Sequence, residues 1–195
     1  MKPFERHRLK WNDCTACPLC EGRQKVVLFR GQIPCDVMMI GEAPGASEDV
    51  LGSPFIGPAG HLLDEIIKTA DQSRFADFED WNDHASLRVG FSNLVACIPL
   101  GDDGNKVKEP PDEAIKACSS RLEEMLMMCK PKLVVCVGKL PWKWLPKLFG
   151  VSQWTDRELI TIAHPAYLLK LDPSQYGLAL HQAVVTLADA FRELE

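Results

Sequence analysis

Four short apolar runs with strand character recur along the chain, covering residues 37–40, 88–97, 131–138 and 158–163. Each run stops at glycine, proline or a polar residue, which is typical of β-strands. Within the run at 131–138, residues 133–137 are continuously apolar, as in strands that are buried on both faces of a sheet. The pattern therefore predicts four strands of a buried sheet.

Segments with helical spacing separate these strands. Apolar residues recur every three or four positions from Gly60 to Ala70, and residues 110–129 begin with two prolines and two acids before a second helical pattern. A short helix is expected at 140–149 and a final helix at 178–194. Strands that alternate with helices predict one parallel α/β domain with helices on both faces.

Three segments carry weaker patterns. We expect a helical or irregular lead-in over residues 1–13, a short strand or apolar strap over 26–29, and a loop or short surface helix over the acidic, aromatic stretch 71–86. None of these changes the predicted α/β alternation.

Composition and charge limit the location and the partners. With 195 residues, of which 46% are apolar, the chain is long enough for one buried core. No window approaches the roughly 18 uninterrupted apolar residues of a membrane span, and the basic N-terminus lacks the apolar stretch of a secretory signal. We therefore expect a cytoplasmic monomer with no membrane partner. The net charge of −5 argues against general electrostatic binding to nucleic acid, although a local basic groove is compatible with it.

The cysteines suggest metal or redox chemistry, because paired spacings in a reducing compartment seldom mean disulfides. Cys14, Cys17 and Cys20 form a CxxCxxC motif, and Cys97 and Cys118 flank a loop rich in proline and charge. The remaining cysteines lie in apolar or helical patterns and are expected to be buried small side chains: Cys35, Cys129 and Cys136.

The loop after the first strand is the best candidate for an active-site floor. The apolar run ends abruptly in Gly41-Glu42-Ala43-Pro44-Gly45, two more acids follow, and Phe55 stands between a proline and a glycine. Open α/β sheets bind ligands outside the carboxyl ends of their strands. Glu42 follows the first predicted strand, Asn93 lies near the end of the second, and His164 follows the fourth. We therefore expect these three side chains to converge at one edge of the sheet.

Several motifs occur in a fixed order: Cys14-x-x-Cys17-Pro18-Leu19, Gly41-Glu42-Ala43-Pro44-Gly45-x-x-Glu48-Asp49, Gly52-x-Pro54-Phe55-Ile56-Gly57-x-Ala59-Gly60, Asn93-x-x-x-Cys97, Cys118 and His164-Pro165. In this order they resemble the iron–sulfur uracil-DNA glycosylases, family 4 of that superfamily. The resemblance extends over about residues 14–190. It implies a three-layer α/β/α sandwich with a four-stranded, mostly parallel sheet, forming a single domain over residues 1–195.

The resemblance also implies a 4Fe-4S cluster that ties the N-terminal segment, residues 1–35, to the core. Its ligands would be Cys14, Cys17, Cys97 and Cys118, which supply the four thiolates that such a cluster requires. Cys20 is the rival ligand. Zinc held by the same four thiolates is the inorganic alternative.

For the site, the resemblance implies excision of uracil that has been flipped out of DNA into a pocket, leaving an abasic site. Gly41, Ala43, Phe55 and Asn93 would bind the base. Phe55 would stack on the ring, and the amide of Asn93 would match uracil O4 and N3–H while disfavouring cytosine.

The catalytic roles follow from the charges that develop as the glycosidic bond breaks. Glu42 would orient water and stabilise the sugar cation, either as a true base or purely electrostatically. His164 would donate a hydrogen bond to uracil O2 and stabilise the anionic leaving group. Glu48 would support this chemistry or merely cap the loop.

The segment after His164 resembles the loop with which the family enters the minor groove. Leu168 or Leu169 would fill the gap left by the flipped base, or would instead anchor the last helix, and Lys170 would contact phosphate. The chain departs from the family in having Ala96 and Ile98 where basic residues are usual, and in a longer loop before Cys118. Two further readings therefore stay open: activity on another modified base or nucleotide, and a cluster-bearing DNA-binding module without turnover.

Overall fold

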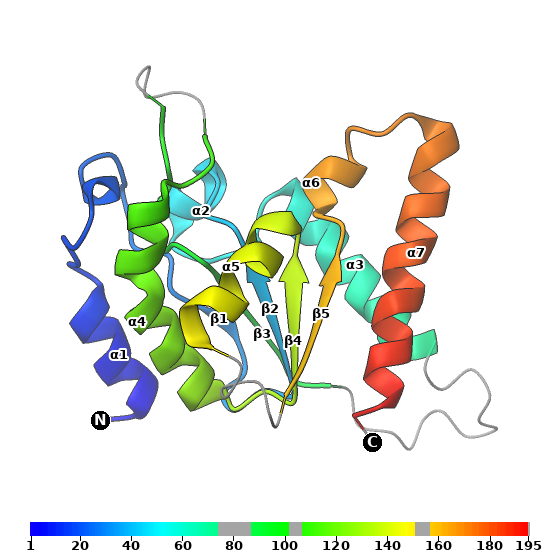
Figure 1. The fold of residues 1–195 in the computed structure, drawn as a ribbon, viewed down its shortest axis with the longest axis horizontal. Helices are drawn as coiled ribbons and strands as arrows, with labels where there is room; N and C mark the ends of the chain where they lie inside the picture. The colour runs from blue at the N-terminus through cyan, green and yellow to red at the C-terminus, as the bar shows by residue number, and fades with distance from the viewer. Residues whose placement is uncertain (74–86, 102–106, 151–156, 195) are drawn as a thin grey trace.

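A computed structural model describes residues 1–73, 87–101, 107–150 and 157–194. Its centre is a five-stranded sheet in the order β1-β3-β2-β4-β5 (Figure 1). The strands are β1 Arg30–Gly31, β2 Val37–Gly41, β3 Val89–Asn93, β4 Leu133–Val137 and β5 Glu158–Ile162.

The mostly parallel sheet is confirmed, but it has five strands where four were predicted. The strands β2 to β5 pair in parallel, whereas the two-residue strand β1 pairs antiparallel with β3, placing Arg30 opposite Phe91. The additional strand is short and lies at the edge of the sheet, and no alternating pattern in the sequence marks it.

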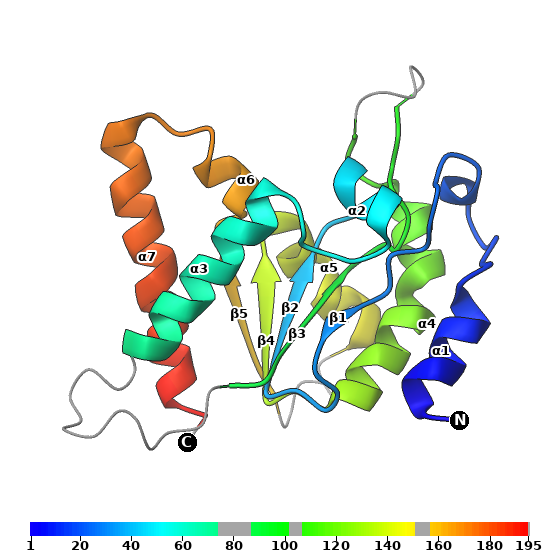
Figure 2. The ribbon, with the colours of Figure 1, turned by 180° about the vertical axis from the view of Figure 1, so that it is seen from behind.

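Helices cover both faces of the sheet, which confirms the layered α/β arrangement (Figures 1 and 2). On one face lie α3 and α7, with α6 beside them, and on the other lie α4 and α5, with α1 outside α4. The helices are α1 Pro3–Trp11, α2 Ala46–Leu51, α3 Pro58–Ser73, α4 Asp112–Cys129, α5 Lys139–Phe149, α6 Pro165–Leu168 and α7 Pro173–Arg192, with a 3-10 turn at Pro18–Cys20.

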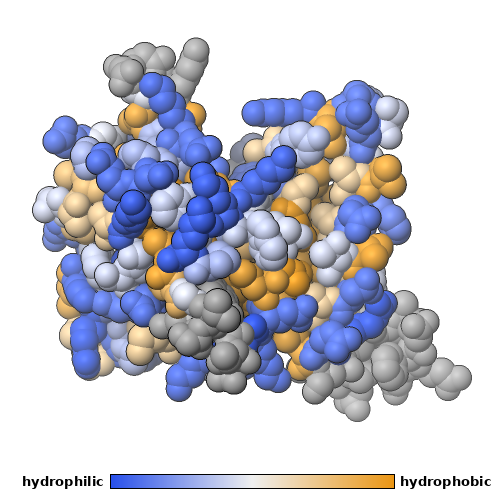
Figure 3. Space-filling view, in the orientation of Figure 1, coloured by the Kyte–Doolittle hydropathy of each residue, from blue (hydrophilic) through white to orange (hydrophobic). Residues whose placement is uncertain are grey.

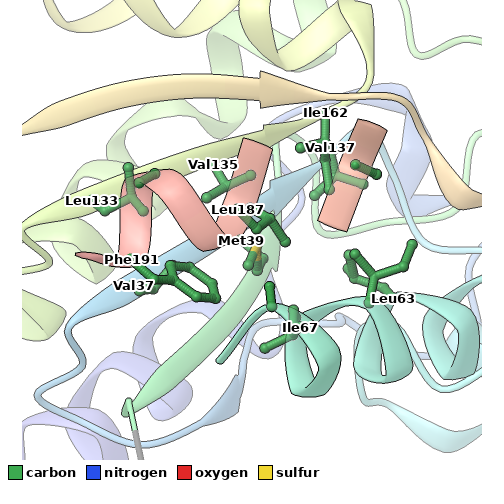
Figure 4. Packing of buried hydrophobic residues seen from close by; sticks show 14 of the residues in the cluster. Val37, Met39, Leu63, Ile67, Leu133, Val135, Val137, Ile162, Leu187 and Phe191 are labelled. Atoms are coloured by element: carbon green, nitrogen blue, oxygen red, sulfur yellow. The ribbon is translucent and has the colours of Figure 1, made fainter. Parts of the chain in front are cut away.

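Alternation along the central strands explains the two cores. Val37 and Met39 face α3 and α7, whereas Met38 and Ile40 face α4 and α5. Because side chains alternate across a strand, an apolar residue at every position of β2 supplies both faces. Figure 4 shows the first core, where Phe191 of α7 lies among the side chains of the strands.

The second predicted strand is shorter than expected, because β3 ends at Asn93 and not at residue 97. The carbonyl oxygens of Asn93 and Leu94 accept hydrogen bonds from the guanidinium group of Arg121, at 2.6 and 2.9 Å. These acceptors are therefore engaged by a side chain of α4 rather than by a neighbouring strand. Residues 94–98 remain buried as irregular chain.

The helices α2 and α6 were not predicted, and α7 begins five residues before the expected position. Asp172 explains the early start of α7, since its side chain accepts hydrogen bonds from the backbone N–H groups of Ser174 and Gln175 at 3.0 and 3.2 Å.

Residues 26–29 form an apolar strap, with the N–H of Val27 donating to the carbonyl of Ala96 at 2.7 Å.

Two expected loops are described only at their margins. Residues 71–73 continue α3, and residues 74–86 of the acidic, aromatic stretch lie outside the described part of the chain, as do residues 102–106 and 151–156. Among the helices that the structure describes, none is both long and apolar enough to cross a membrane.

Candidate functional site

Glu42, Asn93 and His164 line one cleft at the carboxyl ends of the strands. Their convergence, predicted from three strand ends far apart in sequence, is therefore present in the structure. Ala43, Glu48, Phe55 and Lys170 line the same cleft, whereas Gly41 lies behind its wall. The space-filling view shows the surface hollowed at this edge, between α2 and α6 (Figure 3).

Phe55 is held in an unusual backbone conformation beside the cleft. Its φ of 57° is in the left-handed region, which is uncommon for a bulky residue and is found mainly where the surrounding structure imposes it. Gly60 permits this arrangement, because a Cβ atom there would lie 2.0 Å from the carbonyl oxygen of Phe55. The ring packs against Phe91, with 5.8 Å between the ring centres. Phe55 is thus fixed with an edge toward Gly41 and a surface available to the cleft.

Gly41 provides the space in which Phe55 and Asn93 meet. A Cβ atom at Gly41 would lie 2.4 Å from Oδ1 of Asn93 and 2.5 Å from Cζ of Phe55. Both distances are too short for any side chain, so glycine is required at the end of β2 by the close approach of the two side chains. Gly41 therefore shapes the pocket without lining it.

Asn93 is almost completely buried, yet its side chain is open to the cleft. It is 3% exposed, and its backbone is bound on one side by β2 and on the other by the guanidinium of Arg121. Within the described residues, the structure records no hydrogen bond from the side-chain amide. The amide therefore has both a donor and an acceptor free for a ligand.

His164 follows β5 and is oriented by the first turn of α6. Its Nδ1 atom accepts a hydrogen bond from the backbone N–H of Ala166 at 3.1 Å. Burial lowers the pKa of the imidazole; the nearby charge of Glu48 opposes this shift, and Lys170 adds to it. The ring is therefore neutral at neutral pH, with Nδ1 as the acceptor and the proton on Nε2.

Glu42 is half-buried in the cleft. Burial raises the pKa of its carboxyl group, and the negative charge of Glu109 raises it further. Among the described residues, no side-chain hydrogen bond to Glu42 is recorded. An unpaired, desolvated carboxylate of this kind is suited to orienting a polar group or stabilising a cation.

Glu48 has a defined structural role. Its Oε2 atom accepts a hydrogen bond from the backbone N–H of Gly45 at 2.8 Å, at the start of α2. The capping alternative for Glu48 is therefore observed. Its charge also lies close enough to His164 to affect the pKa of the imidazole.

Leu168 and Leu169 differ sharply, and the burial of Leu168 matches the alternative in which it anchors the last helix. Leu168 is 0% exposed in the core beneath α6, whereas Leu169 is 50% exposed. Tyr167, which sequence reasoning did not single out, is 58% exposed and lines the cleft. Its position in the segment after His164 was the available signal.

The four predicted cluster ligands surround a second, smaller cavity. Cys14, Cys17, Cys97 and Cys118 all line it, whereas Cys20 lies in a separate groove. In the described part of the chain, no three side chains of His, Cys, Asp or Glu are gathered closely enough to hold a single metal ion. The thiols instead stand around a common space.

The walls of this cavity disfavour bare thiolates but include two arginines. Burial raises the pKa of Cys97 to about 11, and it raises the pKa of Cys17 as well. Nη1 of Arg23 donates to Sγ of Cys97 at 3.6 Å, and Arg121 also lines the cavity. An iron–sulfur cluster bound by four thiolates fits this donor set, because bound metal keeps thiols deprotonated and the arginines balance their charge.

Comparison with known proteins agrees with this geometry. The model of the Uracil DNA glycosylase superfamily matches residues 29–183. The chain belongs to this superfamily. The match includes the strand ends that carry Glu42, Asn93 and His164.

Relatives in the uracil-DNA glycosylase superfamily include two proteins named type-4 uracil-DNA glycosylase. The one from Pyrobaculum aerophilum is 33% identical over 71% of this chain and 62% of its own length. The one from Thermotoga maritima is 30% identical over 80% of this chain and 78% of its own length. The chain thus spans less than two thirds of the Pyrobaculum protein.

A solved structure supports the fold. Pedobacter heparinus SMUG2 superposes with a TM-score of 0.55 at 15% identity, over 82% of this chain and 76% of that one. At this level of identity the likeness concerns the fold alone.

Proposed function

We propose that the chain is a uracil-DNA glycosylase, which hydrolyses the N-glycosidic bond of a uracil flipped out of DNA and leaves an abasic site. The observation that carries the proposal is the convergence of Glu42, Asn93 and His164 in one cleft beside Phe55. Its relatives named type-4 uracil-DNA glycosylases support the same activity.

Recognition of the base rests on Asn93 and Phe55. The free amide of Asn93 can donate to uracil O4 and accept from N3–H. Cytosine presents an amino group and an unprotonated N3 at these positions, so it would leave the buried amide unsatisfied. Unpaired buried polar groups are costly, which makes this a strong basis for discrimination. Phe55 offers its ring to the face of the base.

Bond cleavage sends the electron pair of the glycosidic bond to N1 of uracil and leaves positive charge on the sugar. The Nε2–H group of His164 donates to O2, where the negative charge of the departing base accumulates. The carboxylate of Glu42 stabilises the sugar cation and orients the water whose oxygen bonds to C1′. Its raised pKa also suits it to accept the proton that the water loses.

The four cysteines around the smaller cavity would hold a 4Fe-4S cluster. All four line one cavity, and four thiolates are the ligand set that such a cluster requires. The cluster would act structurally, connecting the N-terminal segment to the irregular segment after β3 and to α4. Cys20, which lines a different groove, is not assigned as a ligand.

The decisive experiment is an excision assay on a labelled, uracil-containing oligonucleotide, with alkaline cleavage of the abasic sites. Cluster-loaded protein is expected to cleave uracil DNA and to spare the matched oligonucleotide with cytosine. Glu42→Gln should reduce the single-turnover rate, and Glu113→Gln, an exposed acid on α4, serves as the control. DNA binding without any cleavage by the loaded protein would refute the glycosylase and favour a binding module.

A further inference from the structure

Among the residues that the structure describes, Arg121 is a buried cation without an acidic partner. It is 1% exposed, and it is the largest fully buried side chain among the described residues. Its recorded partners are neutral oxygens: the hydroxyl of Ser92 at 2.7 Å and the carbonyls of Asn93 and Leu94. Within the described part of the chain, no ion pair to Arg121 is recorded. Burying a charge in this way is costly unless something else compensates for it.

The orientation of the guanidinium joins two sites. Its Nη atoms bind the end of β3, directly behind the side chain of Asn93 in the cleft. Its Nε atom is buried without a hydrogen-bond partner, and the side chain forms part of the wall of the cysteine cavity. One face of Arg121 is therefore satisfied by the strand, and the other is directed to the cavity without a partner.

Charge balance indicates a role for the side of Arg121 that lines the cysteine cavity. A 4Fe-4S cluster in its oxidised form carries two positive charges, and four thiolates bring the assembly to a net charge of about −2. Arg23 and Arg121 are the two arginines in the cavity wall. Together they would neutralise that charge, and the cluster would in turn offset the cost of burying Arg121.

We propose that Arg121 is a positioning residue that couples the cysteine cavity to the base pocket. The guanidinium group of Arg121 donates to the carbonyls of Asn93 and Leu94 and thereby fixes the position from which the Asn93 side-chain amide meets the base. The positive charge of Arg121 stabilises the thiolate-bound cluster. The role in positioning Asn93 rests on the proposed function, and the role of the positive charge rests on the presence of the cluster.

Two substitutions of Arg121 distinguish the effect of its planar hydrogen-bonding group from the effect of its positive charge. Arg121→Lys keeps the positive charge but cannot bind three oxygens in a planar fork, whereas Arg121→Gln loses the charge as well. Met125→Ala, a fully buried position on the same helix that lines neither site, controls for a general loss of stability.

The positioning role is tested by a double-mutant cycle with Asn93→Ala on the loaded protein. Arg121→Lys is expected to lower the single-turnover excision rate about tenfold, which is in the range for coupled neighbours, and to have little further effect in the Asn93→Ala background. An equal loss in both backgrounds, or the same loss in Met125→Ala, would overturn the positioning role.

The charge role is tested by voltammetry of the loaded proteins, which needs no substrate. Arg121→Gln should shift the midpoint potential of the cluster to more negative values, because removing a nearby cation disfavours addition of an electron. Arg121→Lys and Met125→Ala should stay near the wild-type value. An unshifted potential in Arg121→Gln would overturn the charge role.

If Arg121→Gln does not fold, Arg121→Met, which fills similar volume with an uncharged side chain, takes its place. If loaded wild-type protein leaves uracil DNA intact, the proposed function fails and the positioning role fails with it. The voltammetric result then still decides the charge role by itself.

Discussion

The Nδ1 atom of His164 accepts a hydrogen bond from the backbone N–H of Ala166 at 3.1 Å. This contact is made by the first turn of α6, so the helix that follows the strand sets the tautomer of the histidine. With Nδ1 occupied as an acceptor, the neutral ring carries its proton on Nε2 and can donate to a ligand in the cleft.

His164→Ala is expected to lower the single-turnover excision rate roughly 10²–10³-fold, as is typical for the loss of one donor to a developing anion. His181→Ala, at an exposed histidine of α7, should leave the rate unchanged. Because burial lowers the pKa of His164, the ring should stay neutral through the neutral range, and titrating this group should affect the rate only in acid. A wild-type rate in His164→Ala would remove the histidine from the mechanism.

The pH profile should report the environment of Glu42. Since burial and then Glu109 raise its pKa, the active carboxylate forms only at higher pH, and kcat/KM should rise with pH through this pKa. Glu109→Gln removes the repelling charge and should move the acidic limb to lower pH. Glu113→Gln, on α4, should leave the limb in place. A limb that stays fixed in Glu109→Gln would show that another group controls it.

Gly41→Ala should damage the base pocket while preserving the fold. The new Cβ atom would meet Oδ1 of Asn93 at 2.4 Å and Cζ of Phe55 at 2.5 Å, so both recognition side chains must move. We expect loss of uracil excision with an unchanged circular dichroism spectrum. Gly177→Ala is the matched control, because a Cβ atom there meets nothing within 4 Å. It should retain activity and gain about 0.5–1 kcal/mol of stability, as expected for alanine within a helix.

The two leucines after Tyr167 should separate stability from DNA binding. Leu168→Ala should lower the free energy of unfolding by about 2–5 kcal/mol, because it leaves a cavity beneath α6. Leu169→Ala should leave stability nearly unchanged and should reduce excision from duplex DNA more than from single strands, where no stack has to be held open. Chemical denaturation and paired excision assays measure the two effects. Equal losses on both DNA forms would argue against a wedge.

Glu124 should control retention of the cluster through α1. Its Oε2 atom accepts from Nε1 of Trp11 at 2.7 Å and lies 3.0 Å from Nδ1 of His7, and Trp11 lines the cysteine cavity. Glu124→Ala should release α1 and speed the loss of iron to a chelator. Iron content over time provides the measurement, and Glu113→Gln the control. Unaltered iron loss would show that α1 does not seal the cavity.

The sequence predicted the ends of β2 and β5 to within one residue, although it extended β3 to residue 97. Glu42, Asn93 and His164 follow apolar runs whose length and composition mark buried strands, and parallel strands bring their carboxyl ends to one edge. The spacing of Cys14 and Cys17 likewise indicated a metal site, and these two thiols line one cavity with Cys97 and Cys118.

Contacts between distant segments determine features of the site that the local sequence pattern does not predict. The sequence analysis did not single out Arg121. It lies among the buried residues of α4, and its acceptors belong to the distant end of β3. The adjacent Leu168 and Leu169 are alike in the sequence, and only the packing of α6 against the core buries one and exposes the other.

The chain by itself thus determined which side chains stand at the edge of the sheet, because strand periodicity and parallel pairing are properties of short segments. The tertiary structure alone decided how those side chains are held. The position of Phe55 against Gly41 and the buried guanidinium behind Asn93 each depend on close approach between atoms of separate segments. Such approaches depend on the packing of the whole domain, and no local pattern encodes them.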